Sequence, residues 1–243
     1  MAGLIKTICL IRGKSGESYP EFRERILAML KIASAKEEIL DLRVVLTDKK
    51  PPAVSVIPFR KEKIASVSIK SGRLQDFGNF TGAEGFSGAF EVKEAIPVGY
   101  EKTWKDMEPT PGVNLLTLFR KKASIDQDTF IRRWHNGHTP LSLKIHPLWN
   151  YNRNEVLNEI IPGSESWDGI VEEHFRTQSD LLNPARFFGS PWTMLYRMVQ
   201  VFMDTRSFLD YSTIQTFLAT EYHIKTRELS GTDYSTGTGG KLM

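Results

Sequence analysis

RKKASIDQDTFIRRW, residues 120–134, is the stretch that decides the fold, because the chain carries a second version of it. RGKSGESYPEFRERI, residues 12–26, lies over it without a gap when the sequence is shifted by 108 positions. Both stretches follow an apolar run, KTICLI (6–11) or NLLTLF (114–119), and both lead into a helical pattern. Four positions are identical: Arg12 and Arg120, Lys14 and Lys122, Phe22 and Phe130, Arg25 and Arg133. The second helix is expected to begin near Ser124 or Asp126, whose side chains can accept from free backbone N–H groups.

The rest of each half continues in the same order of elements. Two strand-like runs come next, ILDLRVVL (39–46) and KIASVSIK (63–70) in the first half, LWNYNRNEV (148–156) and WDGIVEEHF (167–175) in the second. A helix and a strand follow, around GRLQDF (72–77) and GAFEVKEAIPV (88–98), then around WTMLYRMVQVFM (192–203) and TIQTFLATEYHI (213–224). The order β-α-β-β-α-β, present twice, predicts an α+β protein made of two tandem ferredoxin-like repeats.

A four-stranded sheet of this kind has one face covered by its two helices and one face open. Two such antiparallel sheets can pack their open faces together into an α/β barrel with the helices outside. The segment MEPTPG (107–112) has the prolines and glycine of a linker. We therefore expect an N-terminal repeat at 1–108, a C-terminal repeat at 109–230 and a flexible tail at 231–243.

The composition is that of an ordinary water-soluble protein. Of the 243 residues, 40% are hydrophobic and 25% are charged, and the net charge of +3 comes from scattered residues, so no nucleic-acid partner is indicated. Cys9 is the only cysteine, which excludes an intrachain disulfide and fits a reducing compartment. Lys6 interrupts the amino-terminal apolar run, which reads as a strand and not as a signal peptide, and no apolar run is long enough to span a membrane. A cytoplasmic protein without a membrane partner is expected.

The histidine pair in FIRRWHNGHTPL, residues 130–141, is the first candidate for chemistry. On a helical wheel, His138 falls within the apolar stripe that contains Trp134, and His135 falls at its margin. Pro140 lacks an N–H and would clash with the preceding turn, so the helix must kink or restart there. His138 is either an acid–base or ligand-contacting group, or a satisfied histidine that stabilises the kink.

A metal site is not expected at this pair. The spacing H-x-x-H lacks the third ligand and the base that H-E-x-x-H supplies to zinc. The first repeat has Leu27 and Leu30 at the positions equivalent to His135 and His138, so only the second repeat carries the feature.

The strand WDGIVEEHF (167–175) is the second candidate. Alternation places Glu172 and His174 on one face, with Ile170, and places Val171, Glu173 and Phe175 on the other. If Glu172 and His174 point into the barrel, the carboxylate and the imidazole share one cavity and can shuttle a proton. The alternative is a hydrated edge strand that carries a surface ion pair.

These stretches together resemble the EthD family. The pattern is F-x-x-x-W-x-x-x-H-x-P-L, then a strand with tyrosine and asparagine, then an aromatic-Asp-Gly strand, within residues 113–230. The matching residues are Phe130, Trp134, His138, Pro140, Leu141, Tyr151, Asn152, Trp167, Asp168, Gly169 and Glu172, with Asp210 before the last strand. EthD proteins belong to the dimeric α/β-barrel superfamily, which also includes antibiotic-biosynthesis monooxygenases, polyketide cyclases, chlorite dismutases and haem-degrading enzymes.

The resemblance implies a barrel that binds a small apolar molecule, aromatic or polyketide-like, without a cofactor. The implied chemistry is proton transfer, as in cyclisation, dehydration or cofactor-free oxygenation, with His138 as acid or base and Glu172 and His174 as its relay. The ligand-binding residues would be Trp134, Tyr151, Asn152 and Asp168. Trp192 and Tyr196 are added from the aromatic segment 187–203, which departs from the family in being longer than its usual second helix.

Two other functions stay open at this point. One is a non-catalytic ligand-binding or accessory protein, and the other is a haem protein with His138, His174 or His223 as axial ligand. The aromatic segment 187–203 can line a pocket, cover it, pack on its own sheet, or join two copies in a homodimer.

Overall fold

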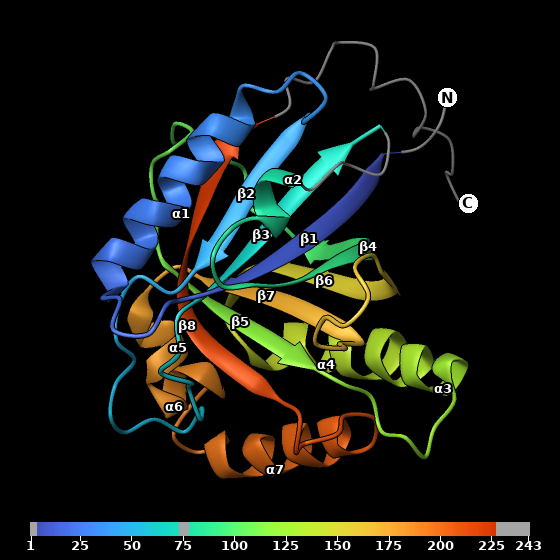
Figure 1. Cartoon of the computed structure of the whole chain (residues 1–243). Helices are drawn as coiled ribbons and strands as arrows, with labels where there is room; N and C mark the ends of the chain where they lie inside the picture. Colours follow the sequence, from blue (N-terminus) through green and yellow to red (C-terminus); the bar gives the residue numbers. More distant parts are fainter. Residues whose placement is uncertain (1–3, 73–77, 227–243) are drawn as a thin grey trace, which may run out of the picture.

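Eight strands close into one antiparallel barrel in the computed structural model, which describes residues 4–72 and 78–226 (Figure 1). The first half supplies β1 (Ile5–Arg12), β2 (Asp41–Leu46), β3 (Ile64–Ser71) and β4 (Phe86–Val98). The second half supplies β5 (Val113–Phe119), β6 (Leu148–Glu159), β7 (Gly169–Phe175) and β8 (Gln215–Lys225).

The strand order confirms the predicted fold class. Around the barrel the order is β1-β3-β2-β8-β5-β7-β6-β4, so each half keeps the ferredoxin-like arrangement of its own four strands. Antiparallel pairing of β2 with β8 and of β4 with β6 joins the halves and leaves no free sheet edge within the barrel. The division into domains at 1–108 and 109–230 stays a prediction, and the predicted tail at 231–243 lies outside the described residues.

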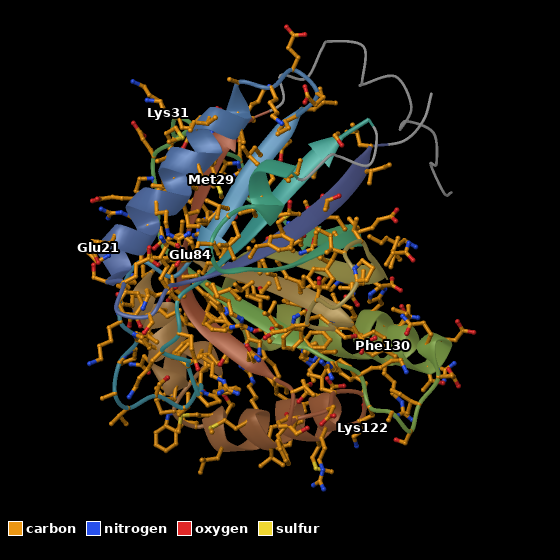
Figure 2. All side chains as sticks on the ribbon, in the orientation of Figure 1. Glu21, Met29, Lys31, Glu84, Lys122 and Phe130 are labelled. Atoms are coloured by element: carbon orange, nitrogen blue, oxygen red, sulfur yellow. The ribbon has the colours of Figure 1, made fainter. Side chains whose placement is uncertain are left out.

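In the first half one long helix covers the sheet. This helix, α1 (Tyr19–Ser34), begins with a capping box formed by Ser18 and Glu21 and buries Phe22, Ile26 and Leu30 against the outer face of the barrel. Glu21 and Lys31 lie on its outer side (Figure 2). A four-residue helix, α2 (Gly78–Thr81), precedes β4. The helix predicted at 72–77 falls mainly on residues outside the described part of the chain.

In the second half the equivalent helix is broken into three pieces. They are α3 (Gln127–Arg132), the π-helix η1 (Arg133–His138) and α4 (Thr139–Ile145). Asp126 caps the start as predicted, its side chain accepting from the Thr129 N–H at 2.7 Å. The predicted restart is also confirmed, since Pro140 lies in the first turn of α4 and the Thr139 N–H bonds back five residues to the Trp134 carbonyl.

Three further helices complete the second half: α5 (Gln178–Leu182), α6 (Pro184–Phe187) and α7 (Met194–Arg206). α7 lies at the lower edge of the molecule in Figure 1, outside β5 and β8. No helix in the described part of the chain has the length and hydropathy needed to cross a bilayer.

The barrel interior has an apolar end and a polar end. The apolar end holds Ile8, Leu10, Val45, Ile64, Phe90, Val92, Leu116, Leu118, Trp167, Ile170, Phe217 and Ala219. At the polar end Arg43, on β2, forms ion pairs with Glu172 on β7 and Glu221 on β8, and both carboxylates are fully buried. Two neighbouring lysines, Lys6 and Lys70, bind Glu94 at 2.6 and 2.5 Å. Ion pairs between side chains of different strands therefore link the strands at the polar end of the barrel interior.

Candidate functional site

A cavity of about 430 Å³ lies on the outer face of the second-half sheet, beneath the broken helix and α7. Its floor comes from the outward side chains of β5, β6, β7 and β8: Leu115, Thr117, Phe119, Tyr151, Val171, Glu173 and Thr216. Its walls come from the helices: Trp134, His138, Ser142, His146, Phe187, Phe188, Met198, Val201 and Phe202. Most of these groups are apolar, which suits a small organic molecule.

The first half also contributes to this cavity. Val56, Ile57 and Pro58, in the long connection between β2 and β3, line one side. Val56, Phe202 and Tyr211 line the cavity and are also 43%, 44% and 45% exposed. These three residues therefore mark its mouth.

His138 is held from both sides where it faces the cavity. Its Nδ1 lies 2.7 Å from Oδ2 of Asp204 on α7, and its Nε2 lies 3.0 Å from the Ser142 hydroxyl on α4. Because the Asp204 carboxylate can only accept, Nδ1 carries the proton, and in the neutral imidazole Nε2 then accepts from the Ser142 O–H. The result is an imidazole fixed in one tautomer with its basic nitrogen beside the cavity.

The π-helix places His138 in this position. An i→i−5 turn adds one residue relative to an α-helix and rotates the residues that come after it, and such turns occur frequently at functional sites. The Thr139 hydroxyl donates to the Trp134 carbonyl at 3.0 Å and accepts from Arg153 at 2.6 Å, which stabilises the break. Trp134, 1% exposed, anchors the segment on Phe119 and Phe130.

Glu173 is the second chemical group of the cavity. It lies on β7 directly opposite Leu115 of β5 and Tyr151 of β6, in the floor. Burial away from any compensating charge raises the pKa of its carboxyl to about 7. A carboxyl of this kind is partly protonated near neutral pH and can donate or accept a proton.

Two further polar residues in the cavity are uncharged. Burial lowers the pKa of His146 to about 4, so its ring is neutral at physiological pH, with Nδ1 bonded to the Phe187 carbonyl at 2.9 Å. Burial, followed by the nearby Glu173, raises the pKa of Tyr151, so its phenol stays protonated. Glu173 and the His138–Asp204 pair are thus the groups able to exchange protons with a ligand.

Of the residues predicted from the sequence, three line this cavity: Trp134, His138 and Tyr151. Glu172 and His174 do not meet His138, because they lie on the inner face of β7 while the cavity faces its outer side. The expected relay from His138 to these two residues is therefore not formed. The alternation along β7 was predicted correctly, but the cavity lies on the other face of the sheet.

Glu172 and His174 belong to the polar end of the barrel interior. Glu172 pairs with Arg43, and the His174 Nε2 lies 2.8 Å from the Pro111 carbonyl. Burial lowers the pKa of His174. Burial opposes the charge on Glu221, but Arg43 and two imidazoles outweigh it and hold the pKa of that carboxyl below its usual value. Asn152 also points inward and donates to Glu94 at 2.8 Å.

The other three predicted ligand-binding residues lie away from the cavity. Asp168 accepts from the Lys121 backbone N–H at 2.9 Å and fixes the turn after β5. Trp192 and Tyr196 are 95% and 70% exposed on the outer side of α7. The helix presents Met198 and Val201 to the cavity from its opposite side, and Phe202 at the border between the two sides.

The sequence-based prediction did not include several residues of the site. Glu173 could have been identified from the sequence, because it is the neighbour of Glu172 on a strand that was already recognised. Ser142 follows His138 by one helical turn, a spacing that can bring the two side chains together. Asp204 and Val56 gave no signal, because only long-range folding brings them to the site.

Two of the candidate histidines for a metal or a haem have other partners. Among residues 4–72 and 78–226, no three His, Cys, Asp or Glu side chains converge as a metal site would require. Both ring nitrogens of His138 and of His174 already have hydrogen-bond partners.

The fold and this cavity define a class: a closed α/β barrel of two ferredoxin-like halves, in which the cavity lies under the helices of one half. Two solved structures share the fold. One is an anthrone oxidase-like protein, 11% identical with a TM-score of 0.60, for which the match covers 93% of this chain and 95% of the other. The second is a protein of Fusobacterium nucleatum subsp. nucleatum ATCC 25586 named "Putative monooxygenase", 10% identical with a TM-score of 0.51, for which the match covers 96% and 98%.

At these identities the likeness shows the fold alone. The chain matches no family model, and no curated protein sequence matches it. The resemblance to EthD proteins therefore stays a prediction.

Proposed function

We propose that the chain is an EthD-like protein that binds a small aromatic or polyketide-like molecule in the outer-face cavity and moves a proton on it. The observation that carries the proposal is the pairing of groups in one apolar cavity: an imidazole fixed by Asp204, and the unpaired carboxyl of Glu173. The volume of about 430 Å³ lies within the range for small-molecule sites.

His138 would act as the base. Asp204 keeps the proton on Nδ1 and stabilises the imidazolium that forms when Nε2 takes a second proton. The Ser142 hydroxyl occupies Nε2 in the free protein, so it either relays the proton or turns aside when the ligand enters. An acidic C–H or phenolic O–H beside this pair would be deprotonated.

Glu173 would act at the oxygen of the same ligand. In its protonated form it can donate to a carbonyl or phenol oxygen on which negative charge develops. Enolisation of an aromatic ketone needs a base at carbon and an acid at oxygen, and an anthrone is a ketone of this type. The solved structure of an anthrone oxidase-like protein supports this choice of substrate class. Cyclisation, dehydration and cofactor-free oxygenation all begin with this step.

A non-catalytic binding protein is the second candidate. The specific observation in its favour is that both nitrogens of His138 are hydrogen-bonded, so the histidine is already satisfied as a cross-link between α4 and α7. In that case the cavity would bind the same ligands without turnover.

The test uses anthrone as the probe, with binding followed by fluorescence of the cavity tryptophan, Trp134, and turnover followed by product formation in air. We expect His138→Ala to lower kcat/KM by roughly 100-fold to 10,000-fold, the contribution of a general base. Binding should change much less, because the cavity walls remain. Asp204→Asn should lower kcat in the same direction, because it no longer fixes the tautomer.

His135→Ala is the matched control, since His135 lies on the same π-helix but does not line the cavity. It should leave both binding and turnover close to wild type. Equal turnover by the wild type and the His138→Ala variant would exclude the catalytic role. Binding without turnover in the wild type would favour the non-catalytic protein.

A further inference from the structure

The outward face of α7 is apolar along its whole length. Its exposed side chains before the last residue are Leu195, Tyr196, Val199, Phe202 and Met203, at 70%, 70%, 61%, 44% and 59% exposure. Trp192, just before the helix, is 95% exposed. A surface helix normally turns such residues to the core and its charges to water. Here the described elements leave the outer side uncovered (Figure 1).

Three polar residues of α7 contact other elements of the chain instead. Asp204 binds His138, and Arg197 donates to the Phe188 carbonyl at 3.2 Å. The Thr205 hydroxyl lies 2.5 Å from the hydroxyl of Tyr211, which lies outside the helix. These contacts fix the rotation of the helix, so the apolar stripe cannot turn inward. No element in the described ranges 4–72 and 78–226 covers it.

The area of this stripe is that of a protein interface. A free aromatic side chain contributes roughly 150–250 Å², and the six exposed fractions together correspond to on the order of 800 Å². The largest apolar patch on a monomer is usually about 300–600 Å². One partner's share of a standard interface is about 800 Å².

The stripe is complementary to itself about Val199. Residues at equal distance before and after Val199 face each other when two such helices pack antiparallel across a two-fold axis. Leu195 then meets Met203, Tyr196 meets Phe202, and Trp192 meets Arg206. No like charges face each other in this register. Arg206, which already lies 5.8 Å from its own Phe202 ring, gains an aromatic ring of the partner.

We propose that a second copy of this chain docks here, with α7 packed antiparallel against the partner's α7 about Val199. The two helix dipoles are then also antiparallel, which favours the pairing. A membrane surface fits the stripe less well. Helices that lie in a bilayer interface carry a face rich in Lys and Arg, whereas the basic residues of α7 are only Arg197 and Arg206 and its acidic residue is Asp204.

The dimer would also close the cavity. Phe202 lines the cavity and is part of the stripe. In the proposed register the partner's Tyr196 packs over Phe202, which marks the mouth. The second copy would thus cover the entrance and hold α7, with Asp204, in place. The docking does not depend on what the cavity binds.

The test is sedimentation velocity of the full chain over a range of concentrations. We expect a reversible dimer for the wild type. Val199→Glu places two carboxylates face to face on the axis and should weaken the dimer by about 100-fold or more. Ile32→Glu is the matched control, because Ile32 is 71% exposed on α1, away from the stripe. It should leave the dimer intact, and the far-ultraviolet circular dichroism of both variants should match that of the wild type.

Disulfide trapping checks the register. Val199→Cys should cross-link two copies under mild oxidation, whereas Ile32→Cys should not, and the native Cys9 is buried and does not interfere. A wild type that stays monomeric at every concentration would overturn the proposal. So would a dimer that Val199→Glu leaves unchanged, or a monomer that binds phosphatidylcholine vesicles through Trp192.

Discussion

Two adjacent glutamates on β7 differ in their role because their side chains point to opposite faces of the strand. Glu172 points into the barrel and is neutralised by Arg43, while Glu173 points into the outer-face cavity without a cation to stabilise it. The same type of side chain therefore forms an ion pair at one position and is a titrating group at the next. The sequence established the alternation, because it is a local property of a strand. It did not show which face bears the cavity, because that depends on how distant strands close.

Glu173 should make stability depend on pH in a definite direction. Its folded-state pKa of about 7 lies above the ordinary value of 4.5. Between these two values the folded chain holds a proton that the unfolded chain has released, so the free energy of unfolding falls as the pH rises from 4.5 to 7. Above pH 7 the loss is complete.

Glu173→Gln removes this titration. We expect the variant to be more stable than the wild type at pH 8 and close to it at pH 4.5, as measured by urea unfolding at both values. Glu24→Gln, at an exposed position on α1, is the control and should not change the pH dependence. A Glu173→Gln variant that is no more stable at pH 8 would contradict the assignment of the raised pKa.

At the scale of elements, the broken helix is the difference between the two repeats. In the first half α1 is continuous and buries Leu30 at the position equivalent to His138. In the second half Pro140 and the π-helix interrupt the element at the same place. The cap at Asp126 and the restart at Pro140 were predictable because they depend on neighbouring residues. The π turn was not, because it also needs Arg153 and Asp204 from distant elements.

Deleting Asn136 tests the role of the π-helix. Asn136 is exposed and occupies the middle of η1, so its loss should let the segment continue as an α-helix. His138 would then rotate by about one residue's turn and lose Asp204. We expect kcat/KM for anthrone to fall by about tenfold or more, with the far-ultraviolet circular dichroism unchanged. A deletion variant with the turnover of the wild type would show that the π turn does not position the site.

At the scale of the whole molecule, the barrel encloses charges from both halves. Arg43 comes from the first half, and Glu172 and Glu221 come from the second. All three are buried, so the pairing gains its stability only when the barrel closes. The tandem barrel itself was predictable from the repeated order of elements and is confirmed. The ionic network was not predictable from the sequence, because neither repeat contains both the arginine and its carboxylate partners.

Replacing Arg43 should therefore affect the whole barrel. Arg43→Met leaves two buried carboxylates without their cation, and we expect it to destabilise the protein by about 3–5 kcal/mol. Arg132→Met, at an exposed site, should change the free energy of unfolding by less than about 0.5 kcal/mol. Chemical denaturation of both variants provides the measurement, and similar values for the two would argue against a stabilising role of the network.

The connection between β2 and β3, residues 47–63, has a consequence for how the ligand preference of such a protein can evolve. It belongs to the half without the histidine, yet Val56, Ile57 and Pro58 form one side of the cavity in the other half, and Figure 1 shows it running down beside α6. Length and sequence can vary in such a connection with little cost to the barrel. The first half, which lacks the chemical groups, would thus still contribute to the selection of the ligand. New ligand preferences can arise there without any change in His138, Glu173 or the strands that support them.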